Sequence, residues 1–267
     1  MKILIVGNVF KDVYLNLDDR TETFETDGDN VKWLNLSFDA SEHRFFRRAG
    51  SLGGAAITLE VLNKMGIESQ ISGSSVRYSE DGIEAGDSAA DLYRYIFVSD
   101  EQTTYFAPSY EHASSFEVPS EDVDCVFVDR SANIEDASAI LDYLEFSPAT
   151  KLVVYARKNP RSKSERALLE RANLVFTERE LPPVSRQEVV RIDHNHVTYR
   201  RVAMNFETPR EELMTHLSIY SILAATILGG IILGKDADEV LKLAKTNVEN
   251  SSLDACLDLD TLLELSA

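Results

Sequence analysis

The order of short apolar runs and helical segments is the feature that most constrains the fold of this chain. Runs typical of buried strands occur in VDCVFVDRS (123–131), TKLVVYARK (150–158) and NLVFTERE (173–180). Segments with helical spacing, IEDASAILDYLEF and SKSERALLERA, lie between them. Parallel strands need a crossover connection, which a helix provides. This order therefore predicts a mostly parallel sheet with helices on both faces.

The N-terminal part follows a different pattern. MKILIVGNVF (1–10) reads as a buried, central strand. Residues 18–32 are acidic and turn-rich, whereas VKWLNLSFD and EHRFFRR alternate apolar and polar residues like strands with one solvated face. No helical segment separates these strands. They predict a small antiparallel sheet beside the main one.

The segment LSIYSILAATILGGIILG (217–234) contains no charged residue and reaches the lower length limit of a membrane-spanning helix. It also contains serine, threonine and three glycines, and the amphipathic stretch KDADEVLKLAKTNVEN follows at once. A helix buried inside an α/β domain fits these features better than a membrane span.

Charge and cysteine content limit the partners and the location. The net charge of −18 repels nucleic acid and anionic lipid, so neither is an expected partner. A phosphorylated ligand would need a local positive site. Cys125 and Cys256 are far apart and have no metal-ligand spacing, which favours a reducing, cytoplasmic location.

Three motifs stand in a specific order: GNVFKD after the first strand, then GGAAITLEVLNKMG, and LGKDADEVLKLAKTN near the end. With its order of elements, the chain resembles the ribokinase (PfkB) family of carbohydrate and nucleoside kinases over nearly its whole length. The resemblance implies a three-layer, ribokinase-like α/β fold in one domain, 1–267. It also implies a small β lid, with strands within about 12–48 and a further candidate at 102–110, through which such proteins often form homodimers.

The resemblance also implies where ligands bind. In the family, an aspartate after the first strand and a glycine pair hold the sugar hydroxyls, and these positions are Asp12, Gly53 and Gly54 here. An asparagine five residues after the first glycine corresponds to Thr58. The family's Asn-x-x-Glu, which organises Mg²⁺ through water, corresponds to the segment TERE, in which only Glu180 is kept.

The catalytic signature of the family, Gly-Ala-Gly-Asp, is missing. Counting back without gaps from the final GKD turn places Ser221 at the position of the catalytic base. A serine hydroxyl stays protonated near neutral pH and cannot take a proton as a carboxylate does. Aligning Glu207-Thr208 with the preceding Asp-Thr pair of the family also gives no glycine. No glycine occurs between residues 87 and 228, where the family holds nucleotide phosphates.

Two functions of different class are therefore open. In the first, the protein is a pseudokinase that binds a small polyol or nucleoside, with phosphoryl transfer impaired or lost and no cofactor. In the second, it is an active ATP-dependent carbohydrate or nucleoside kinase with a non-standard base, using ATP and Mg²⁺. A dimeric scaffold without a ligand is a third reading. The sequence decides neither the enzyme question nor the identity of the ligand.

Overall fold

The chain is described by a computed structural model. The described residues are 1–16, 20–27, 30–38, 52–72, 77–79, 82–84, 93–98, 103–106, 116–132, 137–157, 159–180, 187–193, 195–207, 216–250 and 257–266. Within 11–53, 77–106 and 216–218 the description covers the backbone alone.

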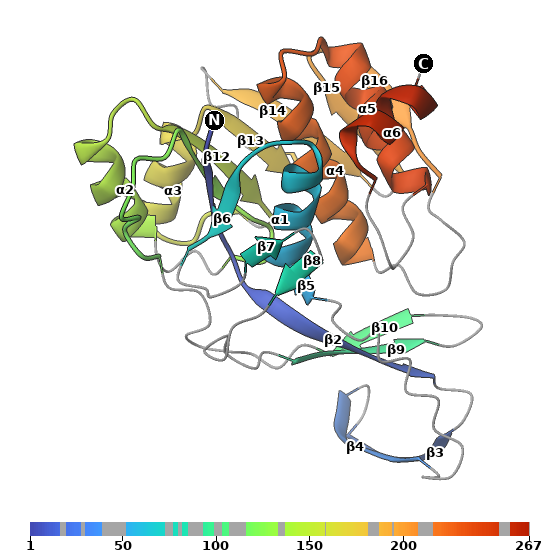
Figure 1. Ribbon diagram of the computed structural model, residues 1–267. Coiled ribbons are helices and arrows are strands. Elements are labelled where there is room, and N and C mark those ends of the chain that lie inside the picture. The colour runs from blue at the N-terminus through green and yellow to red at the C-terminus, as the bar shows by residue number, and fades with distance from the viewer. Residues whose placement is uncertain are drawn as a thin grey trace.

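The main sheet contains eight strands in the order β16-β15-β14-β13-β12-β11-β1-β6 (Figure 1). The six strands from β6 to β14 are parallel, and β15 and β16 continue the sheet antiparallel. The predicted mostly parallel sheet is thus confirmed, and β1 lies inside it, next to the edge strand. The strands are β1 (Ile3–Val6), β6 (Ser69–Ile71), β11 (Cys125–Val128), β12 (Lys151–Ala156), β13 (Leu174–Thr177), β14 (Glu188–Asp193), β15 (His196–Tyr199) and β16 (Val202–Asn205).

Helices cover both faces of this sheet, which confirms the three-layer arrangement (Figure 1). Successive side chains of a strand point to opposite faces. In β1, Ile3 and Ile5 join a core with α1, α4, α5 and α6, whereas Leu4 and Val6 join a second core with α2 and α3. The helices are α1 (Ala55–Lys64), α2 (Ala137–Phe146), α3 (Lys163–Arg171), α4 (His216–Ile232), α5 (Ala237–Asn250) and α6 (Leu259–Ser266).

Helix α4 accounts for the uncharged segment near the C-terminus. Every residue from 219 to 230 is buried except the half-buried Tyr220. A Cβ atom on Gly229 would lie 2.6 Å from the Met65 sulfur, so this glycine lets the end of α1 pack closely on α4. Among the described residues, no helix combines the length and the apolar character that crossing a membrane requires. The prediction of a buried core helix is therefore confirmed.

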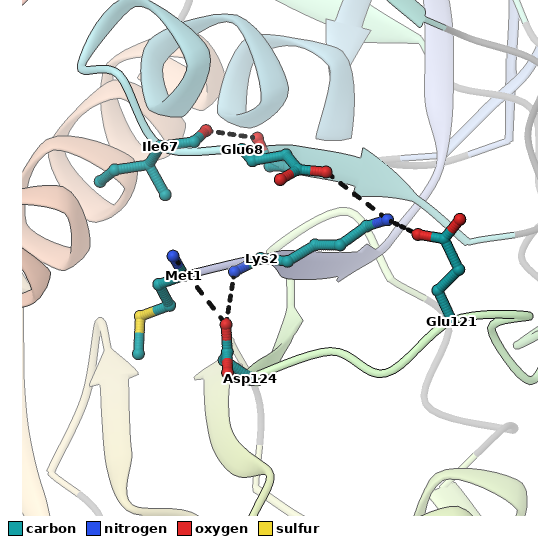
Figure 2. A network of polar contacts seen from close by, with 7 residues as sticks. Met1, Lys2, Ile67, Glu68, Glu121 and Asp124 are labelled. Carbon is teal, nitrogen blue, oxygen red and sulfur yellow. Dashed lines mark hydrogen bonds and ion pairs between the residues drawn. The ribbon is translucent and has the colours of Figure 1, made fainter.

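A network of polar contacts holds the start of β1 at the amino-terminal edge of the main sheet (Figure 2). The Lys2 ammonium lies 2.5 Å from Glu121 and 3.5 Å from Glu68, and the hydrogen bond to Glu121 raises the pKa of Lys2. The Lys2 backbone N–H donates to Asp124 at 2.7 Å, and the Met1 amino group lies 3.9 Å from the same carboxylate. The network joins β1 to the segments that enter β6 and β11.

A second sheet, with strand order β10-β9-β2-β5, lies beside the main one (Figure 1). It is mixed and not antiparallel throughout as predicted, because β2 pairs with β9 in parallel. β3 and β4 form a separate antiparallel pair, as do β7 and β8. The strands are β2 (Val9–Asn16), β3 (Arg20–Asp27), β4 (Asn30–Phe38), β5 (Leu52–Gly54), β7 (Arg77–Ser79), β8 (Gly82–Glu84), β9 (Tyr93–Val98) and β10 (Thr103–Phe106).

Strand β3 corrects the prediction of an acidic turn region at 18–32. The sequence RTETFETD places threonine and phenylalanine between acidic residues. Threonine and phenylalanine favour strands, and the alternation suits a strand with a solvated face. The predicted strand EHRFFRR lies outside the described residues. The lid function of these strands stays a prediction.

The hairpin between β15 and β16 has a two-residue turn, Arg200-Arg201, which the sequence did not predict. Both residues have positive φ, 45° and 70°. This backbone is typical of a type I′ turn, where Asn-Gly is preferred because side chains strain it. Arg200 pairs with Glu188, whereas Arg201 is exposed and takes part in none of the ion pairs between described residues.

Replacing Arg201 with glycine should therefore stabilise the protein. Relief of the left-handed strain should stabilise the folded state by about 1–2 kcal/mol. The greater conformational freedom of glycine in the unfolded chain should cancel about half of this gain. The free energy of unfolding, measured in urea, should rise by about 0.5–1 kcal/mol. Arg201→Ala removes the same side chain and keeps the strain, so it should leave stability nearly unchanged. Equal effects of the two variants would contradict this explanation.

Candidate functional site

Polar residues gather where the parallel strands end. Each of the consecutive strands β11, β12 and β13 is followed at once by a charged residue. The carboxyl ends of parallel strands lie at the same edge of a sheet, and ligands of open α/β sheets bind at that edge. After β1, β11, β12 and β13, the described residues at this edge include Gly7, Asn8, Asp129, Arg130, Ser131, Arg157 and Glu178.

Asp129 is the centre of the first group of side chains, the Asp129 cluster, which consists of Asn8, Thr58, Asp129 and Ser131. The Asp129 side chain is buried, and one carboxylate oxygen accepts a hydrogen bond from the Thr58 hydroxyl at 2.7 Å. The other accepts from the hydroxyl and the backbone N–H of Ser131, at 2.6 and 2.8 Å. The cluster thereby joins the loop after β11 to the first turns of α1.

The turn at Gly54 brings the backbone of α1 against the end of β1. Gly54 has φ +67° and ψ −130°, a backbone region that is open to glycine alone. A Cβ atom at this position would lie 2.3 Å from the Asn8 carbonyl oxygen. That oxygen accepts a hydrogen bond from the Ala55 N–H at 2.9 Å, and the Ser131 hydroxyl oxygen, which donates its proton to Asp129, lies 3.0 Å from it. The glycine is therefore required by both its dihedral angles and this close approach.

The side-chain amide of Asn8 is only half satisfied. Its Nδ2 donates to the Ser131 carbonyl at 2.9 Å. Its Oδ1 is buried and has no hydrogen-bond partner. In the described part of the chain, every other buried side-chain nitrogen or oxygen has one. A buried acceptor without a donor costs about 1–3 kcal/mol. A ligand hydroxyl or a water molecule would remove this cost, so Asn8 is a candidate ligand contact beside the Gly54 turn.

Arg130 is the centre of the second group, the arginine cluster, which consists of Arg130, Tyr155, Arg157, Glu178 and Tyr220. The Nε of Arg130 donates to Glu178 at 2.6 Å, and the Tyr155 hydroxyl donates to the same carboxylate oxygen at 3.2 Å. The Arg130 and Glu178 side chains are only 12% and 22% exposed. The guanidinium carbon lies 5.1 Å from the centre of the Tyr220 ring and 6.0 Å from that of Tyr155, within the range of cation–π attraction.

These contacts fix the protonation states of the arginine cluster. Burial opposes the charge of Arg130, but the hydrogen bond and the charge of Glu178 outweigh it and raise the pKa of Arg130. Burial raises the pKa of Tyr155 well above its usual value, and the charge of Glu178 adds to this effect. Burial also raises the pKa of Tyr220. At neutral pH the cluster therefore holds a charged guanidinium near two protonated tyrosines.

The residues singled out from the sequence lie in different environments. Gly54 and Thr58 both lie at the Asp129 cluster. Thr58 is fully buried and its hydroxyl donates to Asp129, so it stabilises the start of α1 after the Gly54 turn. The side chain of Glu180 is 87% exposed, and its described contact is with Arg191 at 3.4 Å. Ser221 lies inside α4 and is 3% exposed.

The two remaining positions of the predicted sugar site lie in the second sheet. Asp12 belongs to β2 and Gly53 to β5, and these strands are hydrogen-bonded neighbours, with Phe10 opposite Gly53. The side chain of Asp12 lies outside the described part. The ligand-binding roles of both residues stay predictions.

The described carboxylates at this edge fit a magnesium ion poorly. Mg²⁺ in phosphoryl-transfer sites is held by one or two carboxylates together with substrate phosphates. Oε1 of Glu178 accepts from both Arg130 and Tyr155, and an ion bound at this carboxylate would meet the positive charge of Arg130. Within the described ranges, no group of three histidine, cysteine, aspartate or glutamate side chains could hold a metal ion.

Comparison with solved structures supports the fold assignment. Arabidopsis thaliana ribokinase complexed with ribose and ATP has a TM-score of 0.62 and 11% identity, covering 99% of this chain and 98% of that one. A PfkB family carbohydrate kinase from Listeria grayi has a TM-score of 0.60 and 12% identity, with coverage of 100% and 99%. A nucleoside kinase of the ribokinase family from Methanocaldococcus jannaschii has a TM-score of 0.60 and 11% identity, with coverage of 99% and 97%.

These similarities establish a ribokinase-like fold over essentially the whole chain. At such low identity they carry no information on substrate or activity. No protein-family model and no curated protein matches the sequence.

Proposed function

We propose that this chain, which has the ribokinase-like fold, binds a small polyol or nucleoside at the carboxyl edge of its main sheet. In this proposal Asp12, Gly53 and Gly54 hold ligand hydroxyls, and Thr58 supports the turn. The buried, unpartnered Oδ1 of Asn8 beside the Gly54 turn is the observation that carries the proposal, because it calls for a hydrogen-bond donor. A homodimer through the lid and a cytoplasmic location belong to the same proposal.

Phosphoryl transfer is impaired or lost in the same proposal. Transfer to a hydroxyl depends on positioned charges and a group that orients or deprotonates the nucleophile. At the base position counted from the sequence, Ser221 offers a buried hydroxyl inside a helix. Glu178, a nearly buried carboxylate at the edge, is held in an ion pair with Arg130. Neither group is suited to accept a proton from a substrate.

An active ATP-dependent carbohydrate or nucleoside kinase is the second candidate. It is favoured by Arg130 and Arg157, which supply local positive charge in a chain with a net charge of −18. ATP and Mg²⁺ would be its cofactors. Its base would have to come from an acid near the start of α4: Glu207, which is exposed, or Glu211 and Glu212, which lie outside the described residues.

Calorimetry with ribose, adenosine and ATP–Mg²⁺ tests the proposal. We expect ribose or adenosine to bind and ATP–Mg²⁺ to give no turnover with either. Asp12→Ala should weaken that binding about 10- to 100-fold, because hydrogen bonds to a charged group contribute about 1.5–3 kcal/mol. The control Asp122→Ala makes the same charge change at an exposed position in the segment leading to β11 and should have no effect.

Other outcomes separate the candidates. Formation of ADP that depends on the polyol or nucleoside would replace the first candidate by the second. If Asp12→Ala and Asp122→Ala bound the ligand equally well, Asp12 would not belong to the site. If neither ribose, adenosine nor a wider panel of sugars and nucleosides bound, the proposal itself would be wrong.

A further inference from the structure

Two arginines follow neighbouring parallel strands at the carboxyl edge. Val128, the last residue of β11, pairs with Val154 of β12. Arg130 lies two residues beyond this pair, in the turn that follows β11, and Arg157 lies three residues beyond it, directly after β12. Adjacent strands lie about 4.8 Å apart, so the two guanidinium groups start from neighbouring points of the backbone.

Arg130 is held in one orientation before any ligand arrives. Glu178 binds its Nε, and the rings of Tyr155 and Tyr220 lie near its guanidinium carbon. Between described residues, the hydrogen bond of this guanidinium runs from Nε to Glu178, and the Tyr155 side chain also favours its charge. A ligand at this edge would bind the terminal nitrogens of the same fork. A fixed guanidinium fork loses little conformational entropy when it binds a planar or tetrahedral oxyanion.

Arg157 supplies a second positive charge without a carboxylate of its own. Its side chain is exposed and takes part in none of the ion pairs between described residues. Burial lowers the pKa of Arg157, and the positive charge of Arg130 lowers it further, whereas the charge of Glu178 opposes the shift. Two cations and the Glu178 carboxylate thus follow β11, β12 and β13, in a protein that is otherwise strongly acidic.

We propose that Arg130 and Arg157 together bind the phosphoryl group of a phosphate monoester, so that the ligand of this edge is a phosphorylated polyol or nucleoside. A phosphate monoester carries a charge of about −2 at neutral pH and three acceptor oxygens, which match two guanidinium groups. Glu178 acts as a positioning residue for Arg130. The inference rests on the proposed polyol or nucleoside site and specifies its ligand class.

Calorimetry at constant ionic strength tests this inference with five probes: inorganic phosphate, ribose, ribose 5-phosphate, adenosine and AMP. We expect at least one ester to bind about tenfold or more tightly than its parent, because charge-assisted hydrogen bonds are strong. Ribose 5-phosphate and AMP distinguish a sugar phosphate from a nucleotide as the source of the phosphoryl group.

Arg157→Gln should lower the affinity for the ester about tenfold and leave the affinity for the parent unchanged. Arg157→Lys keeps the charge without the fork and should lie between the wild type and Arg157→Gln. Arg171→Gln is the matched control, because it makes the same charge change on an exposed residue at the far end of α3. Since residue 157 is exposed, circular dichroism should show the same fold and melting temperature for all variants.

The results separate this inference from the function on which it rests. Equal affinities for ester and parent, or equal affinities of Arg157→Gln and Arg171→Gln for the ester, would overturn the phosphate subsite and leave the polyol site standing. Binding of inorganic phosphate that Arg157→Gln abolishes, without any binding of ribose or adenosine, would support the subsite and refute the polyol site. Absence of binding by all five probes would overturn both.

Discussion

Replacing Gly54 with alanine is expected to destabilise the protein by about 3 kcal/mol or more and to abolish ligand binding at the carboxyl edge. The dihedral angles of Gly54 are closed to other residues, and its Cβ atom would lie 2.3 Å from the Asn8 carbonyl oxygen and 2.9 Å from the Phe10 ring. The oxygen belongs to the backbone at the end of β1, so it cannot move aside without disturbing the main sheet. Urea unfolding measures the loss of stability, and calorimetry with ribose or adenosine measures the loss of binding.

Gly66 is the matched control for this prediction. It also has a positive φ, +76°, but a Cβ atom there would have no neighbour within 4 Å. Gly66→Ala should therefore cost only the conformational strain, about 1–2 kcal/mol, and should leave ligand binding unchanged. If the two alanine variants were equally destabilised, the close approach between Gly54 and the end of β1 would have no energetic role.

The layers of this fold could be predicted because burial leaves a simple signature in the sequence. β11, β12 and β13 are covered on both faces, so they read as nearly continuous apolar runs. Helix α1 could be placed between its glycine pair and Gly66, whose positive φ ends the helix. Such signals are local, and each element carries its own.

Strands of the second sheet and its neighbours carry weaker local signals. β3 is rich in acidic residues, and only its pairing with β4 reveals it as a strand. The turn between β15 and β16 contains two arginines in place of the usual asparagine and glycine, so its sequence gives no indication of a hairpin. In both cases the structure depends on contacts that propensity does not describe.

The candidate site depends still more on distant contacts. Thr58 and Asp129 are 71 residues apart, and Arg130 and Glu178 are 48 apart, so the register of four parallel strands decides which side chains meet. The resemblance placed Thr58 near the sugar, but no feature of the sequence indicated that its hydroxyl donates to Asp129. One signal could have located the arginine cluster: the apolar runs of β11, β12 and β13 are each followed by charged residues, in DRS, RK and ERE.

The ion pair between Arg130 and Glu178 should be the most sensitive charged contact described in the molecule. Glu178→Gln is expected to lower the free energy of unfolding by about 2–3 kcal/mol, because it leaves a nearly buried guanidinium without its counter-charge. Arg130→Met should have a similar cost, since it leaves the Tyr155 hydroxyl as the one hydrogen-bond donor that the described residues give this carboxylate. The double variant should be more stable than the sum of the two single effects predicts, with a coupling of about 1–2 kcal/mol in urea unfolding.

Glu180→Gln is the matched control. Glu180 lies two residues after Glu178 and carries the same charge, but its ion pair with Arg191 is exposed. The Glu180 and Arg191 side chains are 87% and 43% exposed and lie 3.4 Å apart, so solvent screens their attraction and the variant should cost less than about 0.5 kcal/mol. Additive effects of Arg130→Met and Glu178→Gln, or equal costs of Glu178→Gln and Glu180→Gln, would mean that Glu178 does not hold Arg130 in place. In that case Arg130 would be no better oriented for a phosphoryl group than an arginine on the open surface, and Arg157 alone would have to explain any preference for phosphorylated ligands.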